Sequence, residues 1–294
     1  MINIKKFSYT DILGWSISRY DRFSNCKRQY FYDYYAKFDE AIPLEKIQFL
    51  KNLTSKALEV GNIVHDIIRD MLKRYQISSK PINKNKLFKY SLNLTERYCN
   101  SKTFFEHYYN GELISNSEIY EKVKNMLENL LNSSRFTWLE KNALPSSSEW
   151  IIEPDGFGET RINNYKVFCK VDFLFPILDK IFIMDWKTGK VDMNKHSRQI
   201  MGYSLWVNYH FGKDVSDIIP ILTYLYPQYN EQYIKINNFL IKEFANTVAE
   251  ETKDMYNFLI NIEKNIPKDK KYFPSTSNLF FCKRCNYKEI CSNK

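Results

Sequence analysis

Residues 166–187 read KVFCKVDFLFPILDKIFIMDWK, and this stretch predicts two β-strands joined by a short turn. From Val167 to Phe175, every second side chain points to the same face, because a strand has a period of two. Pro176 breaks the pattern, since proline cannot donate a hydrogen bond to a neighbouring strand, and residues 176–180 are the predicted link. The second predicted strand covers residues 181–187. The chain is therefore organised around a pair of neighbouring strands.

Two acids and a lysine lie within these apolar strands. Asp172 belongs to the first strand, whereas Asp185 and Lys187 share one face of the second and Trp186 points the other way. Buried carboxylates are costly unless they are paired or bind a metal, and Mg²⁺ is a suitable partner for two converging acids. A lysine beside such an ion can orient or deprotonate water. The triplet alone fits equally well a structural role, in which the acids cap strand ends and Lys187 pairs with one of them.

Length, composition and charge restrict the class of protein. The 294 residues are 44% hydrophobic and 26% charged, which is ordinary for a globular protein with a sizeable core. An excess of 43 Lys+Arg over 34 Asp+Glu gives a net charge of +9, which favours polyanionic partners such as nucleic acid. The sequence has no apolar run that predicts a membrane span or a signal peptide, so we expect a cytoplasmic protein. Six cysteines then need an explanation other than disulfides.

Two segments upstream of the strands predict helices. Residues 16–38 interleave basic and aromatic side chains, a mixture that suits phosphates and stacked bases but is equally typical of a helix with a solvated basic face. Residues 56–76 carry an apolar stripe at helical spacing, with His65 at its edge. A lone histidine in that position is more often a packed core residue than a metal ligand. His65 becomes a ligand candidate only if another motif needs a nitrogen donor.

The rest of the chain predicts an α/β fold in which helices flank a central mixed sheet. Residues 80–148 form a helical insertion with two or three helices, one of them over residues 116–132, and Pro145–Ser148 is the predicted linker. Residues 149–236 are the predicted sheet core. This core has strands at 149–153, 219–226 and 232–236, and its helix over 197–211 places Gln199 and Tyr203 one turn apart on one face. A long helix is predicted over residues 238–262.

The C-terminus carries a close trio of cysteines in a C-x2-C-x5-C pattern: Cys282, Cys285 and Cys291. Such spacing lets neighbouring thiolates reach one metal centre. A fourth soft ligand is needed, and Cys26 is the candidate. Cys99 and Cys169 compete with it, although Cys169 alternates with strand residues and is more typical of a packed core position. Zinc and an iron–sulfur cluster both fit four thiolates.

The order of these motifs resembles the RecB-like branch of the PD-(D/E)XK nuclease superfamily. The matching pieces are GNIVH ending at His65, KVDF with Asp172, DWKTG with Asp185 and Lys187, Gln199-x-x-x-Tyr203, Cys26, and the C-terminal trio. Together they span residues 16–291. Among RecB-like proteins, the chain looks most like members with an iron–sulfur cluster, namely the AddB nuclease domain and the CRISPR adaptation exonucleases.

The resemblance implies a role for each matching residue. Mg²⁺ or Mn²⁺ would be held by His65, Asp172, Asp185 and the backbone carbonyl of Trp186. Lys187 would serve the attacking water, and two further residues would position the water, the lysine or the DNA backbone: Gln199 and Tyr203. A [4Fe–4S] cluster with a structural role would be held by four cysteines: Cys26, Cys282, Cys285 and Cys291.

The resemblance also implies the overall organisation and the activity. Residues 1–294 would form a single nuclease domain with a restriction-endonuclease-like core, and residues 272–294 plus Cys26 would bind the cluster. The expected activity is a metal-dependent deoxyribonuclease, an exonuclease on single-stranded or end-containing DNA, with a helicase, an integrase or another nucleic-acid-processing subunit as partner. The setting would be DNA repair, recombination or defence.

Two features depart from the family pattern, and two other functions remain open. Asp185 stands where glutamate is commoner, and residues 80–148 go beyond the compact CRISPR-associated form. One alternative is a catalytically inactive DNA-binding or assembly subunit. The other is a zinc-stabilised interaction protein in which the acids are structural. The presence of all three members of the set Asp172, Asp185 and Lys187 argues against a decayed site.

Overall fold

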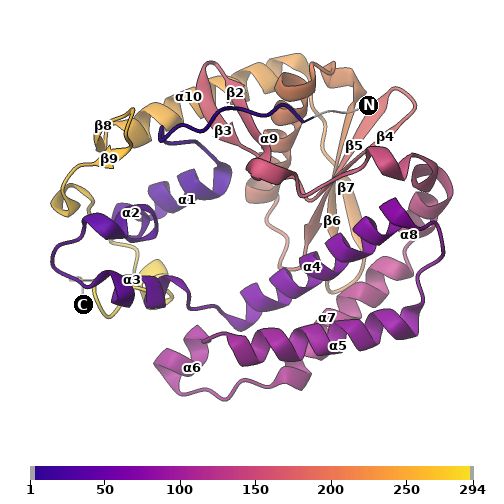
Figure 1. The fold of residues 1–294 in the computed structure, drawn as a ribbon, viewed down its shortest axis with the longest axis horizontal. Coiled ribbons are helices and arrows are strands. Elements are labelled where there is room, and N and C mark those ends of the chain that lie inside the picture. The colour runs from indigo at the N-terminus through magenta and orange to yellow at the C-terminus, as the bar shows by residue number, and fades with distance from the viewer. Residues whose placement is uncertain (1–3, 292–294) are drawn as a thin grey trace. The chain divides into compact units, whose positions relative to one another are not determined.

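The computed structural model describes residues 4–291 and separates the chain into two units (Figure 1). Unit 1 consists of Met1–Lys6, Thr54–Thr160 and Cys169–Phe244. Unit 2 consists of Phe7–Leu53, Arg161–Phe168 and Ala245–Lys294. Each unit thus gathers segments that are distant in sequence. That both units form a single nuclease domain stays a prediction.

A five-stranded mixed sheet forms the centre of unit 1. Its order is β1-β4-β5-β6-β7, and its strands are β1 (Ile151–Ile152), β4 (Phe173–Ile177), β5 (Lys180–Lys187), β6 (Ile218–Tyr224) and β7 (Asn230–Tyr233). Only β5 and β6 are parallel, while the other neighbouring pairs are antiparallel. Two parallel neighbours need a crossover connection, and helix α9 (Met193–Phe211) lies within it. The predicted α/β fold with a mixed sheet and flanking helices is confirmed.

The strand predicted over residues 167–175 is in fact two strands. β3 (Tyr165–Phe168) pairs with β2 (Glu159–Ile162) in a separate sheet, and residues 169–172 belong to no strand before β4 begins. The predicted link is also too long, because Pro176 lies inside β4 opposite Ile181. β1 pairs only with the first two residues of β4, so Pro176 lies where β4 is an edge strand and a missing donor is tolerated. The turn shrinks to residues 178–179.

The predicted insertion contains the α-helices α5 (Lys84–Ser101), α6 (Phe105–Asn110), α7 (Asn116–Leu131) and α8 (Ser134–Trp138). Of these, α5 and α7 pack against α4 (Lys56–Ile77), which was expected over residues 56–76. α4, α5 and α7 run side by side (Figure 1). The expected linker at 145–148 is instead part of a 3-10 helix, Leu144–Glu149, which follows a π-helical turn at Leu139–Ala143. None of the helices within residues 4–291 is both long and apolar enough to cross a membrane.

One hydrophobic core joins these helices to the sheet. Ile67 of α4 and Leu127 of α7 are fully buried in it, together with Phe173 and Met184 of the sheet. Because side chains alternate along β5, Met184 and Trp186 face this helical layer, while Asp185 faces the opposite side. α9 packs on β5 and β6. The alternation along β5 therefore directs its polar residues away from the main core.

Replacing Leu127 with alanine is expected to lower the free energy of unfolding by about 2–5 kcal/mol. The side chain is fully buried, so its loss removes apolar contacts and leaves a cavity that neighbouring groups fill incompletely. Urea unfolding measures the change. The matched control is Leu113→Ala, whose side chain is 87% exposed and whose loss should change stability by less than about 0.5 kcal/mol. Equal effects of the two variants would contradict the placement of α7.

Unit 2 brings the N-terminal and C-terminal segments together. Its α-helices and strands are α1 (Ile17–Asn25), α2 (Lys27–Tyr35), α3 (Leu44–Lys51), the end of β2, β3, most of α10 (Asn238–Tyr256), β8 (Leu259–Asn261), β9 (Ile266–Pro267) and α11 (Leu279–Lys283). The helix predicted over 16–38 is interrupted at Cys26, whose backbone is extended. Cys26 ends α1, and its sulfur accepts a hydrogen bond from the backbone N–H of Gln29 at the start of α2. The long helix predicted to 262 ends at Tyr256.

Candidate active site and cysteine pocket

A cleft of about 580 Å³ in unit 1 collects most of the predicted site residues. Its lining includes His65 of α4, Asp172 just before β4, Asp185, Trp186 and Lys187 of β5, and Gln199 of α9. Tyr203 lies one helical turn beyond Gln199 and is buried. Four segments that are far apart in sequence thus meet at the end of β5.

The irregular segment 169–172 places the Asp172 carboxylate beside the backbone of β5. Asp172 Oδ2 accepts a hydrogen bond of 3.0 Å from the backbone N–H of Trp186. The imidazole of His65 spans the same two residues, with Nδ1 3.5 Å from Asp172 Oδ2 and Nε2 3.1 Å from the Trp186 carbonyl oxygen. Three of the predicted metal donors, the carboxylate, the imidazole and the carbonyl, therefore lie against one another.

Asp185 has the feature that most favours a cation. Its side chain is fully buried, and among residues 4–291 only the Lys187 ammonium reaches the carboxylate, so Oδ1 is left without a partner. Lys187 Nζ lies 2.5 Å from Oδ2 as an ion pair. Buried carboxylates normally accept hydrogen bonds, so oxygens without them need another partner. Burial and the charge of Asp172 raise the pKa of Asp185 to about 6 against the opposing effect of Lys187. A divalent cation would supply the missing partner.

The donor set fits Mg²⁺ or Mn²⁺, which take carboxylate and carbonyl oxygens and, for Mn²⁺, imidazole nitrogen. Burial alone would raise the pKa of Asp172, but His65 outweighs it and holds that pKa below its usual value. Burial would lower the pKa of His65, but Asp172 raises it to about 9, so the imidazole would have to release a proton to bind an ion. Within the described chain, no three His, Cys, Asp or Glu side chains already stand at metal-ligand spacing, so the donors would have to close around an ion.

A chain of hydrogen bonds fixes the position of Lys187. Its ammonium donates to Gln199 Oε1 at 2.6 Å, and Gln199 Nε2 donates to the hydroxyl oxygen of Tyr203 at 2.7 Å. Burial and the two aspartates raise the pKa of Tyr203 well above 10, so its phenol stays protonated. The three residues are thus coupled, and the ammonium is held beside Asp185.

Sequence reasoning missed two residues that lie beside Lys187. Tyr224 of β6 lies directly opposite Lys187 of β5, and its hydroxyl is 2.9 Å from His196 Nδ1. Burial and the nearby Lys187 lower the pKa of His196 to about 4, so the imidazole is neutral at pH 7. The available signal was weak, because His196 stands one residue before the helix predicted over 197–211 and three residues before Gln199.

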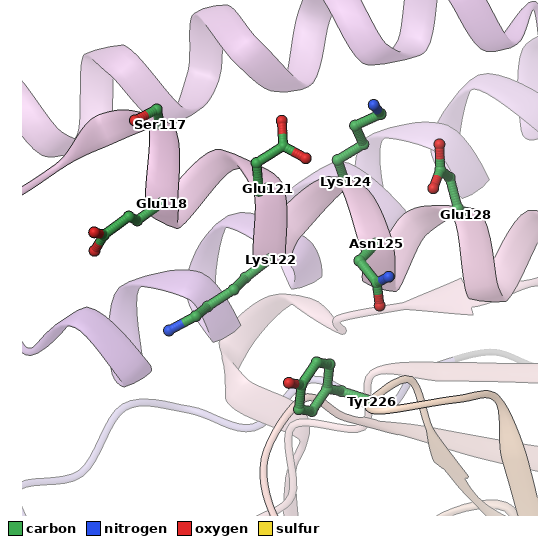
Figure 2. A pocket seen from close by; sticks show the side chains of 8 residues that line it. All are labelled: Ser117, Glu118, Glu121, Lys122, Lys124, Asn125, Glu128 and Tyr226. Carbon is green, nitrogen blue, oxygen red and sulfur yellow. The ribbon is translucent and has the colours of Figure 1, made fainter.

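A second hollow, of about 630 Å³, lies beside α7 and differs from the cleft in its chemistry. Figure 2 shows Asn125 on the side of α7 that faces Tyr226, whereas Glu121, Lys124 and Glu128 point away from that ring. Acids and lysines are interspersed along the helix and do not converge. This arrangement is typical of a solvated helix face, and we assign no site to it.

Four cysteines line one small pocket of about 60 Å³ in unit 2: Cys26, Cys282, Cys285 and Cys291. Within residues 4–291, these four sulfurs do not already stand at the spacing of metal ligands. Burial raises the pKa of Cys285 to about 11, with Cys26 and Cys291 adding to the effect. The competing cysteines belong to unit 1, where Cys99 lies in α5 and the buried Cys169 donates to the Gly202 carbonyl oxygen at 3.4 Å.

Comparisons with known proteins identify the family. A family model of the PD-(D/E)XK nuclease superfamily matches residues 14–292. No curated protein matched the chain. A solved structure named "Crystal structure of SSO0001" is 19% identical with a TM-score of 0.32, and the match covers 65% of this chain and 79% of that one. A similarity that low carries no argument about function. Because the family model spans nearly the whole sequence, the chain belongs to the PD-(D/E)XK nuclease superfamily.

Proposed function

We propose that this protein is a metal-dependent deoxyribonuclease that hydrolyses phosphodiester bonds, and that it acts as an exonuclease on single-stranded or end-containing DNA. The observation that carries the proposal is the Asp185 carboxylate, which is fully buried and whose Oδ1 has no partner within residues 4–291, while Lys187 alone reaches Oδ2. It lies in a cleft with Asp172 and His65, beside a lysine whose position is fixed. Membership of a nuclease superfamily supports the same reaction.

The proposed mechanism assigns one task to each side chain. Mg²⁺ or Mn²⁺, when bound, polarises the scissile phosphate and lowers the pKa of the attacking water. His65, Asp172, Asp185 and the Trp186 carbonyl would hold that ion. Lys187 donates a hydrogen bond that orients the water, and its charge offsets the negative charge that develops on the phosphate.

Gln199 and Tyr203 act in this mechanism as positioning residues. Gln199 accepts a hydrogen bond from Lys187 and donates one to Tyr203, so the amide restricts the rotation of the long lysine side chain. The phenol of Tyr203 anchors the amide from the buried side. Holding the ammonium in place before the substrate arrives lowers the entropic cost of reaching the transition state.

We further propose that the four cysteines of the unit 2 pocket hold a [4Fe–4S] cluster with a structural role. Thiolates are the usual ligands of such clusters, and all four sulfur side chains line the same pocket. Binding would release thiol protons, because Cys285 has a raised pKa. The competing proposal is a zinc ion at the same four cysteines. A brown protein after anaerobic purification supports the cluster, and a colourless protein with stoichiometric zinc supports the competitor.

The proposed setting is the cytoplasm, with DNA as the substrate and a helicase, an integrase or another nucleic-acid-processing subunit as partner. The net charge of +9 supports a polyanionic substrate. Six free cysteines are in keeping with a reducing compartment.

Linear single-stranded DNA labelled at either end is expected to be degraded in the presence of Mn²⁺, while a circular single strand of the same sequence is expected to persist. The reason is that an exonuclease must engage a strand end before it cuts. Products are followed over time on denaturing gels, with protein purified anaerobically. Cleavage of the circle would show an endonuclease instead, and failure to cut either substrate would contradict the proposed activity.

A further inference from the structure

Four lysines line the cleft, and three of them are already paired with carboxylates: Lys102, Lys170 and Lys187. Lys102 Nζ lies 2.8 Å from Oε1 of the fully buried Glu59, and Lys170 Nζ lies 2.6 Å from Glu153 Oε2. Lys187 pairs with Asp185, as described above. In the pairs of Lys102 and Lys170 the carboxylate offsets the positive charge, so these two lysines add little net attraction for an anionic strand, and Lys187 is assigned to the reacting water and phosphate.

Lys195 is the fourth lysine, and its ammonium has no carboxylate partner anywhere in residues 4–291. Its side chain is exposed, and only its backbone N–H is engaged, with Asp192 Oδ1 at 3.1 Å. Lys195 lies in the first turn of α9, four residues before Gln199 and eight before Tyr203. Residues four apart share a helix face, so Lys195 extends the face of Gln199 and Tyr203 by one turn towards the outside.

We propose that Lys195 binds a backbone phosphate of the nucleic-acid strand adjacent to the bond that is cut. This inference rests on the proposed nuclease function and adds a substrate contact to it. An unpaired ammonium at the edge of a cleft that contains two catalytic acids attracts a phosphate that those acids would otherwise repel. A lysine contacts phosphate as a point charge and does not read the bases. Lys195 therefore contributes to affinity and to the position of the strand, without sequence preference.

The test compares two alanine variants that lose the same charge. Lys195→Ala removes the proposed contact, while Lys190→Ala removes an exposed lysine from the β5–α9 connection that does not line the cleft. Affinity for a fluorescent single-stranded oligonucleotide is measured by anisotropy in EDTA, which prevents cleavage, over a series of salt concentrations. Each phosphate contact on a single strand contributes about 0.7 to the slope of log K against log salt. The slope should therefore fall by about 0.7 for Lys195→Ala and stay at the wild-type value for Lys190→Ala.

Kinetics with Mn²⁺ provide a second measurement. Removing a contact that is equally strong in the ground state and the transition state raises KM and leaves kcat unchanged. Lys195→Ala should show this pattern, and Lys195→Arg, which keeps the charge, should restore most of the affinity. A loss confined to kcat would overturn the inference, because Lys195 would then take part in the chemical step.

The outcomes separate this inference from the proposed function. If the wild-type protein binds and cuts DNA but Lys195→Ala keeps the wild-type salt slope, only the inference is overturned. If Lys190→Ala lowers the slope as much as Lys195→Ala does, the effect comes from the general positive field and the specific contact is overturned. If the wild-type protein neither binds nor cuts any strand, the proposed function fails and the inference falls with it.

Discussion

Replacing Asp185 with asparagine is expected to lower kcat/KM for linear DNA by about a thousandfold or more, which corresponds to about 4 kcal/mol of transition-state stabilisation. The amide keeps the size of the side chain but removes the negative charge that we expect to hold the cation. The loss of the cation removes both polarisation of the phosphate and activation of the water. The measurement is the initial rate of cleavage in Mn²⁺ across substrate concentrations.

The same variant should not lose stability in the absence of metal. Burial and the neighbouring Asp172 raise the pKa of Asp185, which means that folding disfavours its ionised form despite the ion pair with Lys187. Neutralising the side chain therefore relieves a cost. If Asp185 were instead a structural partner of Lys187, the substitution would leave the lysine unpaired and destabilise the protein. Urea unfolding without divalent ions distinguishes a metal ligand from a structural acid.

A matched control comes from another acid in the same cleft. Asp66 is already engaged by the hydroxyl of Tyr98 and by Arg69, so its oxygens are not free for a cation. Mn²⁺ should raise the unfolding free energy of the wild type and of Asp66→Asn, but not that of Asp185→Asn, because only a protein that binds the ion is stabilised by it. Persistent cleavage by the double variant Asp185→Ala, Lys187→Ala would refute the site.

Regular periodicity made part of this site predictable. The 56–76 prediction agrees with α4 to within one residue at its end, because the apolar stripe and the cap at Ser55 mark its limits. The strand β5 was equally predictable, and its period of two correctly placed Asp185 and Lys187 on one face. The break at residues 169–172 was not predictable, since the alternation continues through a segment where the backbone leaves the sheet. Asp172 reaches the backbone of Trp186 from that segment.

The pairing of lysines with acids from distant segments could not be predicted from the sequence either, for a different reason. Nothing in the local sequence distinguishes Lys102 from Lys195, since both are isolated lysines in a basic chain. They differ because Glu59, 43 residues before Lys102, is buried beside it, while no acid reaches Lys195 within the described chain. Such differences depend on tertiary packing, which local patterns do not encode. The proximity of Cys26 to the C-terminal trio is a similar case, suggested by the need for a fourth ligand and by the family resemblance.

Replacing Cys285 with serine is expected to abolish iron binding and the visible absorption of the protein, and to lower the stability of unit 2. A cluster held by Cys26 and the C-terminal cysteines would link two segments separated by most of the chain. In the loop-closure model, a cross-link across a loop this long contributes about 5 kcal/mol. Anaerobic purification followed by iron analysis and urea unfolding measures both effects.

Contacts that remain without the cluster limit how far the stability can fall. Arg28 Nε donates to the Phe273 carbonyl oxygen at 2.8 Å, and the Tyr287 hydroxyl donates to Asp33 Oδ1 at 2.6 Å. Both join the N-terminal and C-terminal segments of unit 2 independently of the sulfurs. We therefore expect Cys285→Ser to leave unit 2 folded at low temperature but to unfold at a lower urea concentration than the wild type.

The control for this variant is Cys99→Ser, which removes a cysteine of unit 1 and should keep both the iron and the wild-type stability of unit 2. If Cys285→Ser retained iron at about four atoms per chain, the proposed ligand set would be wrong. If the wild type were colourless and held one zinc, the pocket would be a zinc site. In the zinc case the loss of stability on removing Cys285 would still report whether the bound metal links the two ends of the chain, because serine preserves the remaining contacts of unit 2.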